Sequence, residues 1–505
     1  MPKSQQALAT ALQRTRERAT GEIVRGPDIS ARDRTLLVKH GFLVEIIKGW
    51  YALSTPQART GGSTFWHAHF WSFVSAYLRH RFGADYCLSA EHSLDLWSGN
   101  TQTPAQLIVI AGRGGASTLQ LPNRASLLIY ADKKRLPAST ETRHGVQIMP
   151  LAAALVRVGP AYFRQFSTGA EIALRLVRPD DLSRVLLGET GTLAAAGRLV
   201  GALRHCGLVE QADRVSADLD GAGLEFNVTD PFVAPPQLPP GLVFTSPYAG
   251  RLKTLWRQMR PLAHELEPAA AAAFSSSDAK AYLDRVAEIY THDAYHSLSI
   301  EGYQVTPELI ARIAKGEWNP AADGMDQDQV NAMAAKGYHG AFNAVLASVR
   351  EIVSGQPAAN IVGRDLPNWY RALFGPSVQA GLLPAYALAG YRDRAVFIRG
   401  SEHVPPPHDA VPGLVDTLFE LLTAESSAWV RAVLGHFFFV YIHPYADGNG
   451  RIGRFILNAM LASGGYPWTV IRVEHRRAYM SALESASTRH DIGDFARFVA
   501  AEMET

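Results

Sequence analysis

An apolar run followed by a proline and a glycine-rich turn constrains the fold more than any other part of the chain. The run, 432–442, is apolar at all but two positions and is long enough for a buried helix. Proline cannot continue a helix, so we expect this helix to end at about His443, just before Pro444. Residues 446–450 are typical of a turn, and 451–462 predict a second helix. The chain is therefore expected to place two consecutive helices around a tight corner.

The corner between the two predicted helices carries groups that suit a bound polyphosphate. The second helix begins there, and a helix N-terminus offers free N–H groups and a partial positive charge. Gly448 and Gly450 let the main chain approach phosphate oxygens closely. Arg451 and Arg454 lie three residues apart, so both forked guanidinium groups can project from the same side of the first turn. We therefore expect these positions to bind phosphate.

Two further side chains at the corner fit the same ligand. Asp447 is a hard oxygen ligand, which suits a Mg²⁺ ion that bridges phosphates. His443 titrates near neutral pH and can accept a proton. Each residue alone has a common structural explanation, a helix cap for the histidine and a turn for residues 446–450. Together, at this spacing between two apolar helices, they favour a nucleoside triphosphate site.

The segment from His443 to Arg454 resembles the signature of Fic proteins, HPF-x-[D/E]-GN-[G/K]-R-x-x-R. It departs from the signature only at Tyr445, where phenylalanine is commoner and where we expect an aromatic packing position. The resemblance implies an all-α Fic fold and the transfer of AMP from ATP to a protein hydroxyl, with release of pyrophosphate. A few Fic relatives move other phosphate-containing groups. ATP and Mg²⁺ are thus the expected substrate and cofactor.

The resemblance also implies a role for each position of the signature. By it, His443 deprotonates a Ser, Thr or Tyr hydroxyl of the target protein, and Asp447 holds Mg²⁺. The nucleotide-binding positions that it implies are Gly448, Asn449 and Gly450 as the anion hole, Arg451 and Arg454 at the distal phosphates, and Asn458 beside the nucleotide.

A second stretch upstream resembles the β-hairpin flap of Fic proteins, followed by their proline-rich loop. Apolar and other residues alternate there as in a short edge strand, which could pair with an extended segment of the target. An ordinary hairpin packed on the core is the alternative. The residues expected in this flap are Val396, Phe397, Ile398 and Arg399.

A third motif, Ser297 to Gly302, resembles the Fic inhibitory motif [S/T]-x-x-x-E-[G/N]. The Glu301 carboxylate, placed beside Arg454, would form a charge-assisted pair and occupy the cation that the γ-phosphate needs. The alternative is a surface glutamate before a glycine that caps a helix. In some relatives the same glutamate orients a water that removes AMP from the target, so a reverse activity is left open.

A length of 505 residues predicts two or three domains. The proline-rich stretch 230–250 is expected to be a semi-rigid linker, with the Fic domain and its inhibitory helix in 251–505. Residues 56–229 contain both strand-like and helix-like runs. Their order weakly resembles that of type IV abortive-infection antitoxins. We therefore predict a mixed α/β middle domain.

Residues 1–55 contain nine Lys and Arg against five Asp and Glu. Residues 30–40 predict a helix, and 42–53 predict two strands that turn at a lysine and a glycine. This order resembles the winged helix-turn-helix of type IV abortive-infection antitoxins, whose basic helix would enter a major groove. A plain protein-interaction module is the alternative. The candidate DNA contacts are Arg32, Arg34, Lys39 and Lys48.

Composition bears on the partners and the cellular location that we expect for the chain. The net charge is only +2, so bulk charge points to neither a nucleic acid nor a membrane. Two cysteines give no disulfide framework, and no signal-type or membrane-spanning run is evident, so we expect a cytoplasmic protein. Homodimerisation is left open. The rival function is a DNA-binding regulator whose Fic domain senses ATP or a partner.

Overall fold

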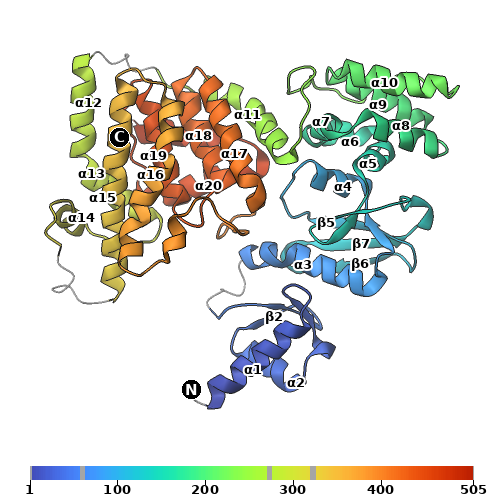
Figure 1. Ribbon diagram of the computed structural model, residues 1–505, viewed down its shortest axis with the longest axis horizontal. Helices are drawn as coiled ribbons and strands as arrows, with labels where there is room; N and C mark the ends of the chain where they lie inside the picture. The colour runs from blue at the N-terminus through green and yellow to red at the C-terminus, as the bar shows by residue number, and fades with distance from the viewer. Residues whose placement is uncertain (1–2, 57–62, 270–275, 319–325, 504–505) are drawn as a thin grey trace. The chain divides into compact units, whose positions relative to one another are not determined.

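The computed structural model describes residues 3–56, 63–269, 276–318 and 326–503 (Figure 1). The chain divides into two compact units. The first contains residues 1–251 together with 397–404, and the second contains 252–396 together with 405–505.

A small three-stranded sheet opens the first unit, with strand order β1-β3-β2. Ser30 caps helix α2 by accepting the N–H of Asp33, and Gly49, at φ 81°, makes the turn between β2 and β3. The helix expected over 30–40 and the strand pair expected over 42–53 are therefore present. The elements are α1 (Lys3–Arg18), β1 (Ile23–Arg25), α2 (Ala31–Lys39), β2 (Leu43–Ile47) and β3 (Trp50–Leu53).

A four-stranded mixed sheet with order β4-β5-β7-β6 forms the middle of the unit, and β5 and β7 run parallel. Helix α3 packs against its apolar face in one core, and the later helices share a second core. The strands are β4 (Tyr86–Leu88), β5 (Gln106–Ala111), β6 (Ser117–Gln120), β7 (Ser126–Ala131), β8 (Glu141–Arg143) and β9 (Val146–Ile148). The helices are α3 (Ser63–Phe82), α4 (Ala90–Trp97), α5 (Leu151–Arg157), α6 (Pro160–Gln165), α7 (Ser167–Leu176), α8 (Pro179–Gly188), α9 (Leu193–His205) and α10 (Val209–Gly221).

The proline-rich segment 230–246 forms no helix or strand, and buried charges of α7 fix it to the first unit. Arg175 is fully buried and donates to the carbonyls of Pro239, at 3.0 Å, and Leu242, at 2.8 Å. Glu171 pairs with Arg175 at 2.8 Å and accepts the N–H of Leu238 at 3.1 Å. A segment that the sequence presents as a linker is thus bonded to α7 over residues 237–244.

The second unit is helical throughout the described residues. Helix α19 contacts α15, α16 and α18 and is buried at every position except Gly450. This burial makes α19 a rigid platform for its own N-terminus. The helices are α11 (Pro247–Glu265, which begins in the first unit), α12 (Ser276–Glu288), α13 (Tyr290–Ile300), α14 (Pro307–Ala314), α15 (Asp326–Val353), α16 (Ala358–Gln379), α17 (Val411–Ala424), α18 (Ala428–Ile442), α19 (Asn449–Ala462), α20 (Arg476–Arg489) and α21 (Gly493–Met503).

The edge strand expected at Val396 to Arg399 is absent, so that prediction was wrong. Residues 390–404 are described in full, and they contain turns and irregular backbone but no strand. Alternation of side chains describes a strand only where a neighbouring strand supplies the hydrogen-bond ladder. Here the segment instead closes a turn, in which the N–H of Ser401 donates to the carbonyl of Ile398 at 3.1 Å.

We predict that Arg175→Ala frees the proline-rich segment. The substitution leaves the buried Glu171 carboxylate without its cation, which costs about 3–5 kcal/mol of stability. Hydrogen exchange of residues 237–244, measured by mass spectrometry on the full chain, should accelerate. Arg204→Ala, which removes an exposed ion pair with Asp213, is the control and should change little. Equal exchange in the two variants would contradict this role of Arg175.

Candidate active site

The corner expected from the sequence is present between α18 and α19. His443 ends α18 in the left-handed conformation, at φ 53°, and its N–H donates to the carbonyl of Phe439 at 3.0 Å. Gly448, at φ 82°, begins α19 in the same conformation. Two left-handed residues five positions apart reverse the chain, so the end of one helix lies beside the start of the next.

A reciprocal pair of hydrogen bonds holds the corner in shape. The Asn449 side chain accepts the N–H of Tyr445 and donates to its carbonyl, both at 2.9 Å. The Tyr445 ring is buried and stacks on Tyr370, with ring centroids 3.8 Å apart and planes 6° from parallel. Tyr445 is thus the aromatic packing residue that the sequence suggested. Asn449 commits its side chain to the turn, so its main chain is the part left for a ligand.

Two glycines let other groups approach the corner. A Cβ at Gly448 would lie 2.6 Å from the Phe374 ring, and a Cβ at Gly450 would lie 2.3 Å from the Glu301 carboxylate. The first N–H groups of α19 have no partner within the helix, because helix geometry provides none. Close approach and unpaired donors together make this helix start suitable for an anion.

The His443 imidazole is held neutral and oriented. Its Nδ1 lies 3.3 Å from the carbonyl of Val440, so Nδ1 carries the hydrogen and Nε2 is left as the basic nitrogen. Burial lowers the pKa of His443 to about 4. The imidazole is therefore unprotonated at neutral pH and can accept a proton from a substrate.

Arg454 is buried and is held by the motif that ends α13. Its Nη2 lies 2.8 Å from the Glu301 carboxylate, and its Nε donates to the Ser297 hydroxyl at 2.9 Å. Burial alone would raise the pKa of Glu301, but the charges of Arg454 and Arg451 outweigh burial and lower it. Gly302, at φ 94°, ends the helix as the motif requires. The structure thus brings Ser297, Glu301 and Arg454 together.

A buried carboxylate on the same face of α13 anchors the helix one turn earlier. Asp293, one turn before Ser297, accepts the Tyr338 hydroxyl at 2.6 Å and the Trp468 indole N–H at 3.1 Å. Burial raises the pKa of Asp293, although these two donors oppose the shift. The glutamate therefore extends from a helix with a fixed position.

Arg451 is 1% exposed and lies between two aromatic rings. Its guanidinium carbon is 5.2 Å from the centroid of Tyr303 and 5.0 Å from that of Phe374. Its Nη2 is 3.4 Å from the carboxylate of Asp447. Within the described residues, Nε of Arg451 and Nη1 of Arg454 have no hydrogen-bond partner. Buried donors without partners are uncommon, and phosphate oxygens are acceptors of the kind that such donors bind.

Asp447 fits a magnesium ion that is held mainly by phosphates. Its side chain is 67% exposed at the mouth of the corner. No group of three or more candidate metal ligands occurs among the described residues. One carboxylate together with substrate phosphates is the usual environment of protein-bound Mg²⁺, whereas a resident metal would require more protein ligands.

Asn458 lies on α19, four residues after Arg454. It is buried, and its amide accepts the N–H of Thr469 at 2.7 Å and donates to the Thr469 carbonyl at 3.0 Å. In this geometry Asn458 holds the loop after α19, and a contact with a nucleotide would compete with these bonds. Residues 397–399 of the expected flap belong to the first unit.

Sequence reasoning missed the aromatic residues around the arginines. Tyr303 directly follows the inhibitory motif, so an aromatic at that position was a visible signal. Phe374 and Tyr370 are on α16, far from the corner in sequence, and no local pattern marks them.

The candidate DNA contacts lie on α2 and at the β2–β3 turn. Arg32, Lys39 and Lys48 are exposed, whereas Arg34 is half-buried and donates to the carbonyl of Gly26 at 3.2 Å. The three exposed cations remain candidates, and Arg34 has a structural partner.

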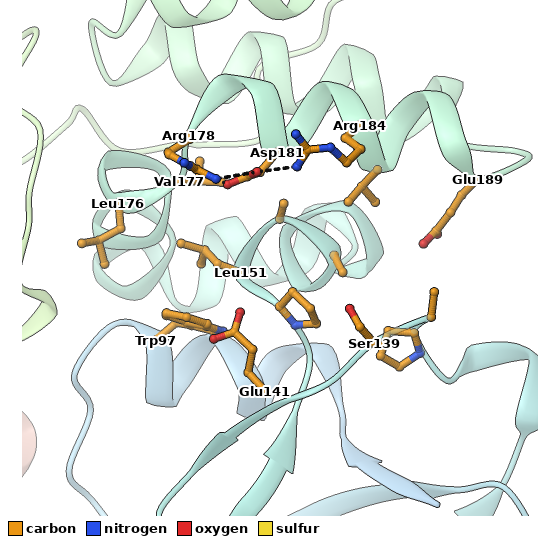
Figure 2. A pocket seen from close by; sticks show the side chains of 16 residues that line it. Trp97, Ser139, Glu141, Leu151, Leu176, Val177, Arg178, Asp181, Arg184 and Glu189 are labelled. Atoms are coloured by element: carbon orange, nitrogen blue, oxygen red, sulfur yellow. Dashed lines mark hydrogen bonds and ion pairs between the residues drawn. The ribbon is translucent and has the colours of Figure 1, made fainter.

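A hollow of about 580 Å³ lies in the first unit, between α5, α8 and the loop before β8. Figure 2 shows Arg178 and Arg184 both directed at Asp181, on the wall opposite Trp97 and Glu141. Both arginines pair with that one carboxylate, and among the described residues no histidine lines the hollow. The α18–α19 corner is therefore the candidate active site. None of the described helices combines the length and apolarity needed to cross a bilayer.

Comparisons with known proteins agree with this choice. Residues 364–461 match the model of the Fic/DOC family. Curated relatives include Protein adenylyltransferase Fic of Culex quinquefasciatus, which is 30% identical over 223 residues, 42% of this chain and 40% of that one. The protein of the same name in Nematostella vectensis is 30% identical over 222 residues, 43% of this chain and 47% of that one. The chain thus spans less than half the length of these curated relatives.

Two similar solved structures are a Fic domain containing signaling protein from Bacteroides thetaiotaomicron and Fic-1 from C. elegans. The first has a TM-score of 0.34 at 18% identity and covers 49% of this chain and 92% of that chain. The second has a TM-score of 0.35 at 18% identity and covers 67% of this chain and 90% of that chain. TM-scores this low do not establish a shared fold.

We predict that Gly448→Ala destabilises the chain more than Gly381→Ala does. Both glycines are left-handed, at φ 82° and 72°, but only Gly448 has a ring within contact distance of an added Cβ. Left-handed backbone costs roughly 1–2 kcal/mol in either variant, and overpacking against Phe374 adds about 1–3 kcal/mol at Gly448. Chemical denaturation of the full chain measures the difference, and equal losses would contradict the close packing of this corner.

Proposed function

We propose that this chain, which carries a Fic/DOC domain, is a protein adenylyltransferase that transfers AMP from ATP to a Ser, Thr or Tyr hydroxyl of a target protein. The observation that carries this proposal is the placement of a neutral His443 beside a helix start with two buried arginines. Nε of Arg451 and Nη1 of Arg454 lack partners among the described residues. The relatives named protein adenylyltransferase support the same reaction.

The phosphates of ATP supply the partners that these arginines lack. Main-chain N–H groups at the start of α19 bind the proximal phosphates, and the guanidinium groups bind the distal ones. When Mg²⁺ is bound, it neutralises phosphate charge, and Asp447 is the residue that would hold it. The protein itself contributes positioning and fixed charge, as in other phosphate-centred transfers.

His443 moves the proton of the reaction. Its Nε2 takes the hydrogen of the target hydroxyl as that oxygen bonds to the α-phosphorus. The bond from the α-phosphorus to the bridging oxygen breaks, and its electron pair leaves with pyrophosphate. The Nδ1 contact with Val440 fixes the tautomer that this step needs.

Glu301 restrains the reaction from the end of α13. Its carboxylate occupies Nη2 of Arg454 at 2.8 Å, where a distal phosphate would bind. A carboxylate and a phosphate of the same charge compete for one cation. ATP therefore binds in a productive pose only when the glutamate moves away.

We predict that Glu301→Gly raises AMP transfer roughly tenfold or more, because it frees a charge-assisted contact of about 1.4 kcal/mol or more. The measurement is incorporation of labelled AMP from ATP into the chain or into a lysate protein. Glu301→Gln keeps the shape without the charge and should give an intermediate rise. Glu308→Ala, an exposed glutamate on α14, is the control.

His443→Ala in the Glu301→Gly background should abolish this incorporation while the circular dichroism spectrum is retained. Undiminished transfer by the folded His443→Ala protein would show that His443 is not the general base. Equal incorporation by Glu301→Gly and the wild type would show that Glu301 does not inhibit AMP transfer.

A second candidate function is binding of duplex DNA by the N-terminal subdomain. The observation that favours it is the exposure of Arg32, Lys39 and Lys48 on α2 and at the β2–β3 turn, the order of elements that a winged helix would use. This function uses a different part of the chain, so the two candidates are compatible.

We predict that replacing Arg32, Lys39 and Lys48 together by alanine weakens binding to duplex DNA from upstream of the chain's own gene, measured by gel shift. The salt dependence of this binding should also fall. The matched control replaces three other exposed cations of the same unit, Lys133, Lys134 and Arg135. Loss of the shift in both variants alike would indicate non-specific attraction. An unchanged shift in the first variant would exclude this surface.

A further inference from the structure

Arg392 has an unusual environment for a buried cation. The residue is 6% exposed, and the hydrogen bonds of its guanidinium go to main-chain carbonyls. Nε donates to His443 at 2.8 Å, Nη1 to Arg394 at 3.0 Å and Nη2 to Pro406 at 2.5 Å. Its own N–H donates to the carbonyl of Pro444 at 2.9 Å. One side chain thus joins three separate segments of the second unit.

Two of the carbonyls near the Arg392 guanidinium belong to the end of α18. A helix leaves its last carbonyls unpaired, and α18 ends with Ile442 and His443. Arg392 Nη2 also lies 3.4 Å from the carbonyl of Ile442. A cation at a helix C-terminus is favoured by the helix dipole. The guanidinium therefore stabilises the end of the helix that carries the candidate base.

The same contacts hold His443 in a conformation that it would not adopt freely. A histidine at φ 53° is left-handed, which costs roughly 1–2 kcal/mol for a residue with a side chain. The hydrogen bonds of Arg392 to the carbonyl of His443 and to the carbonyl of the next residue offset this cost. The direction of the imidazole depends on this backbone conformation.

We propose that Arg392 is the positioning residue for His443 in the AMP transfer. The assignment of its catalytic effect rests on the proposed function, whereas the positioning itself does not. Arg392 also binds the carbonyls of Arg394 and Pro406, which lie before and after the segment 396–399 that the sequence suggested as a target-binding flap.

A purely structural role has a different consequence. If Arg392 had only a structural role, its loss would lower the stability of the protein. The active site of the molecules that remain folded would be unchanged. If Arg392 positions His443, its loss changes the environment of the imidazole in molecules that remain folded. The charged groups that act on His443 are Arg392 itself, Glu301 and Asp447, and burial is the largest influence on its pKa.

Arg431 provides a matched control within the same helix. It is a half-buried arginine near the start of α18 that donates to the carbonyl of Ser426 at 3.2 Å and to the hydroxyl of Ser463 at 3.0 Å. Twelve residues separate it from His443, about 18 Å along the helix. Arg431→Gln removes a comparable set of bonds at a distance from the base.

The first measurement is the titration of His443, which needs no turnover. The rate of carbethoxylation of His443 by diethyl pyrocarbonate is followed against pH in the full chain, with peptide mass spectrometry as the readout. In the wild type the midpoint should lie near pH 4. Arg392→Gln should raise it toward the ordinary value of about 6.5, because water enters and a nearby positive charge is lost. Arg392→Lys should raise it by less, and Arg431→Gln should leave it unchanged.

The second measurement is catalysis in the Glu301→Gly background. Arg392→Gln and Arg392→Lys should each lower kcat for AMP transfer tenfold or more and change KM for ATP less than twofold, since the phosphate-binding groups are untouched. If Arg392→Gln fails to fold, Arg392→Lys provides both readouts.

The proposal is overturned if the Arg392 variants move neither the midpoint nor kcat beyond the Arg431→Gln control. Absence of AMP transfer in the Glu301→Gly parent would instead reject the proposed function. The titration would still decide whether Arg392 positions the imidazole.

Discussion

The hydrogen bonds between the Asn449 side chain and the main chain of Tyr445 fix the corner on which the candidate site depends. Because both bonds are buried, losing the amide would leave a donor and an acceptor unpaired, at a cost of about 1–3 kcal/mol each. The corner places the end of α18 beside the start of α19. A proton acceptor and an anion-binding helix start therefore come from adjacent positions in the chain.

A site for a polyphosphate must keep buried positive charge stable when the ligand is absent. The Glu301 carboxylate stabilises the charge of Arg454 when no ligand is bound. The aromatic rings of Tyr303 and Phe374 partly stabilise the charge of Arg451. The segment 301–303 thus contacts both arginines. Restraint of the reaction and stability of the resting state follow from the same contacts, so releasing the restraint should require a nucleotide or a partner that replaces them.

Local patterns predicted the corner, the inhibitory helix and the elements of residues 30–53, because each depends on neighbours in sequence. The edge strand at Val396 was wrong because alternation does not supply a partner strand. Long-range contacts gave no local signal, as for Arg175 with the proline-rich segment and Asn458 with its loop. The carbonyl contacts of Arg392 likewise join segments that are 14 and 51 residues away. Only the folded chain shows them.

The central claim is that the start of α19, with Arg451 and Arg454, binds a polyphosphate. Calorimetric titration of the Glu301→Gly, His443→Ala double variant with ATP, ADP and AMP tests it without turnover. Affinity should fall in that order, because each phosphate removed gives up a charge-assisted contact worth about 1.5–3 kcal/mol, a factor of tenfold or more in Kd. Equal affinity for the three nucleotides, or no binding of ATP, would contradict the account.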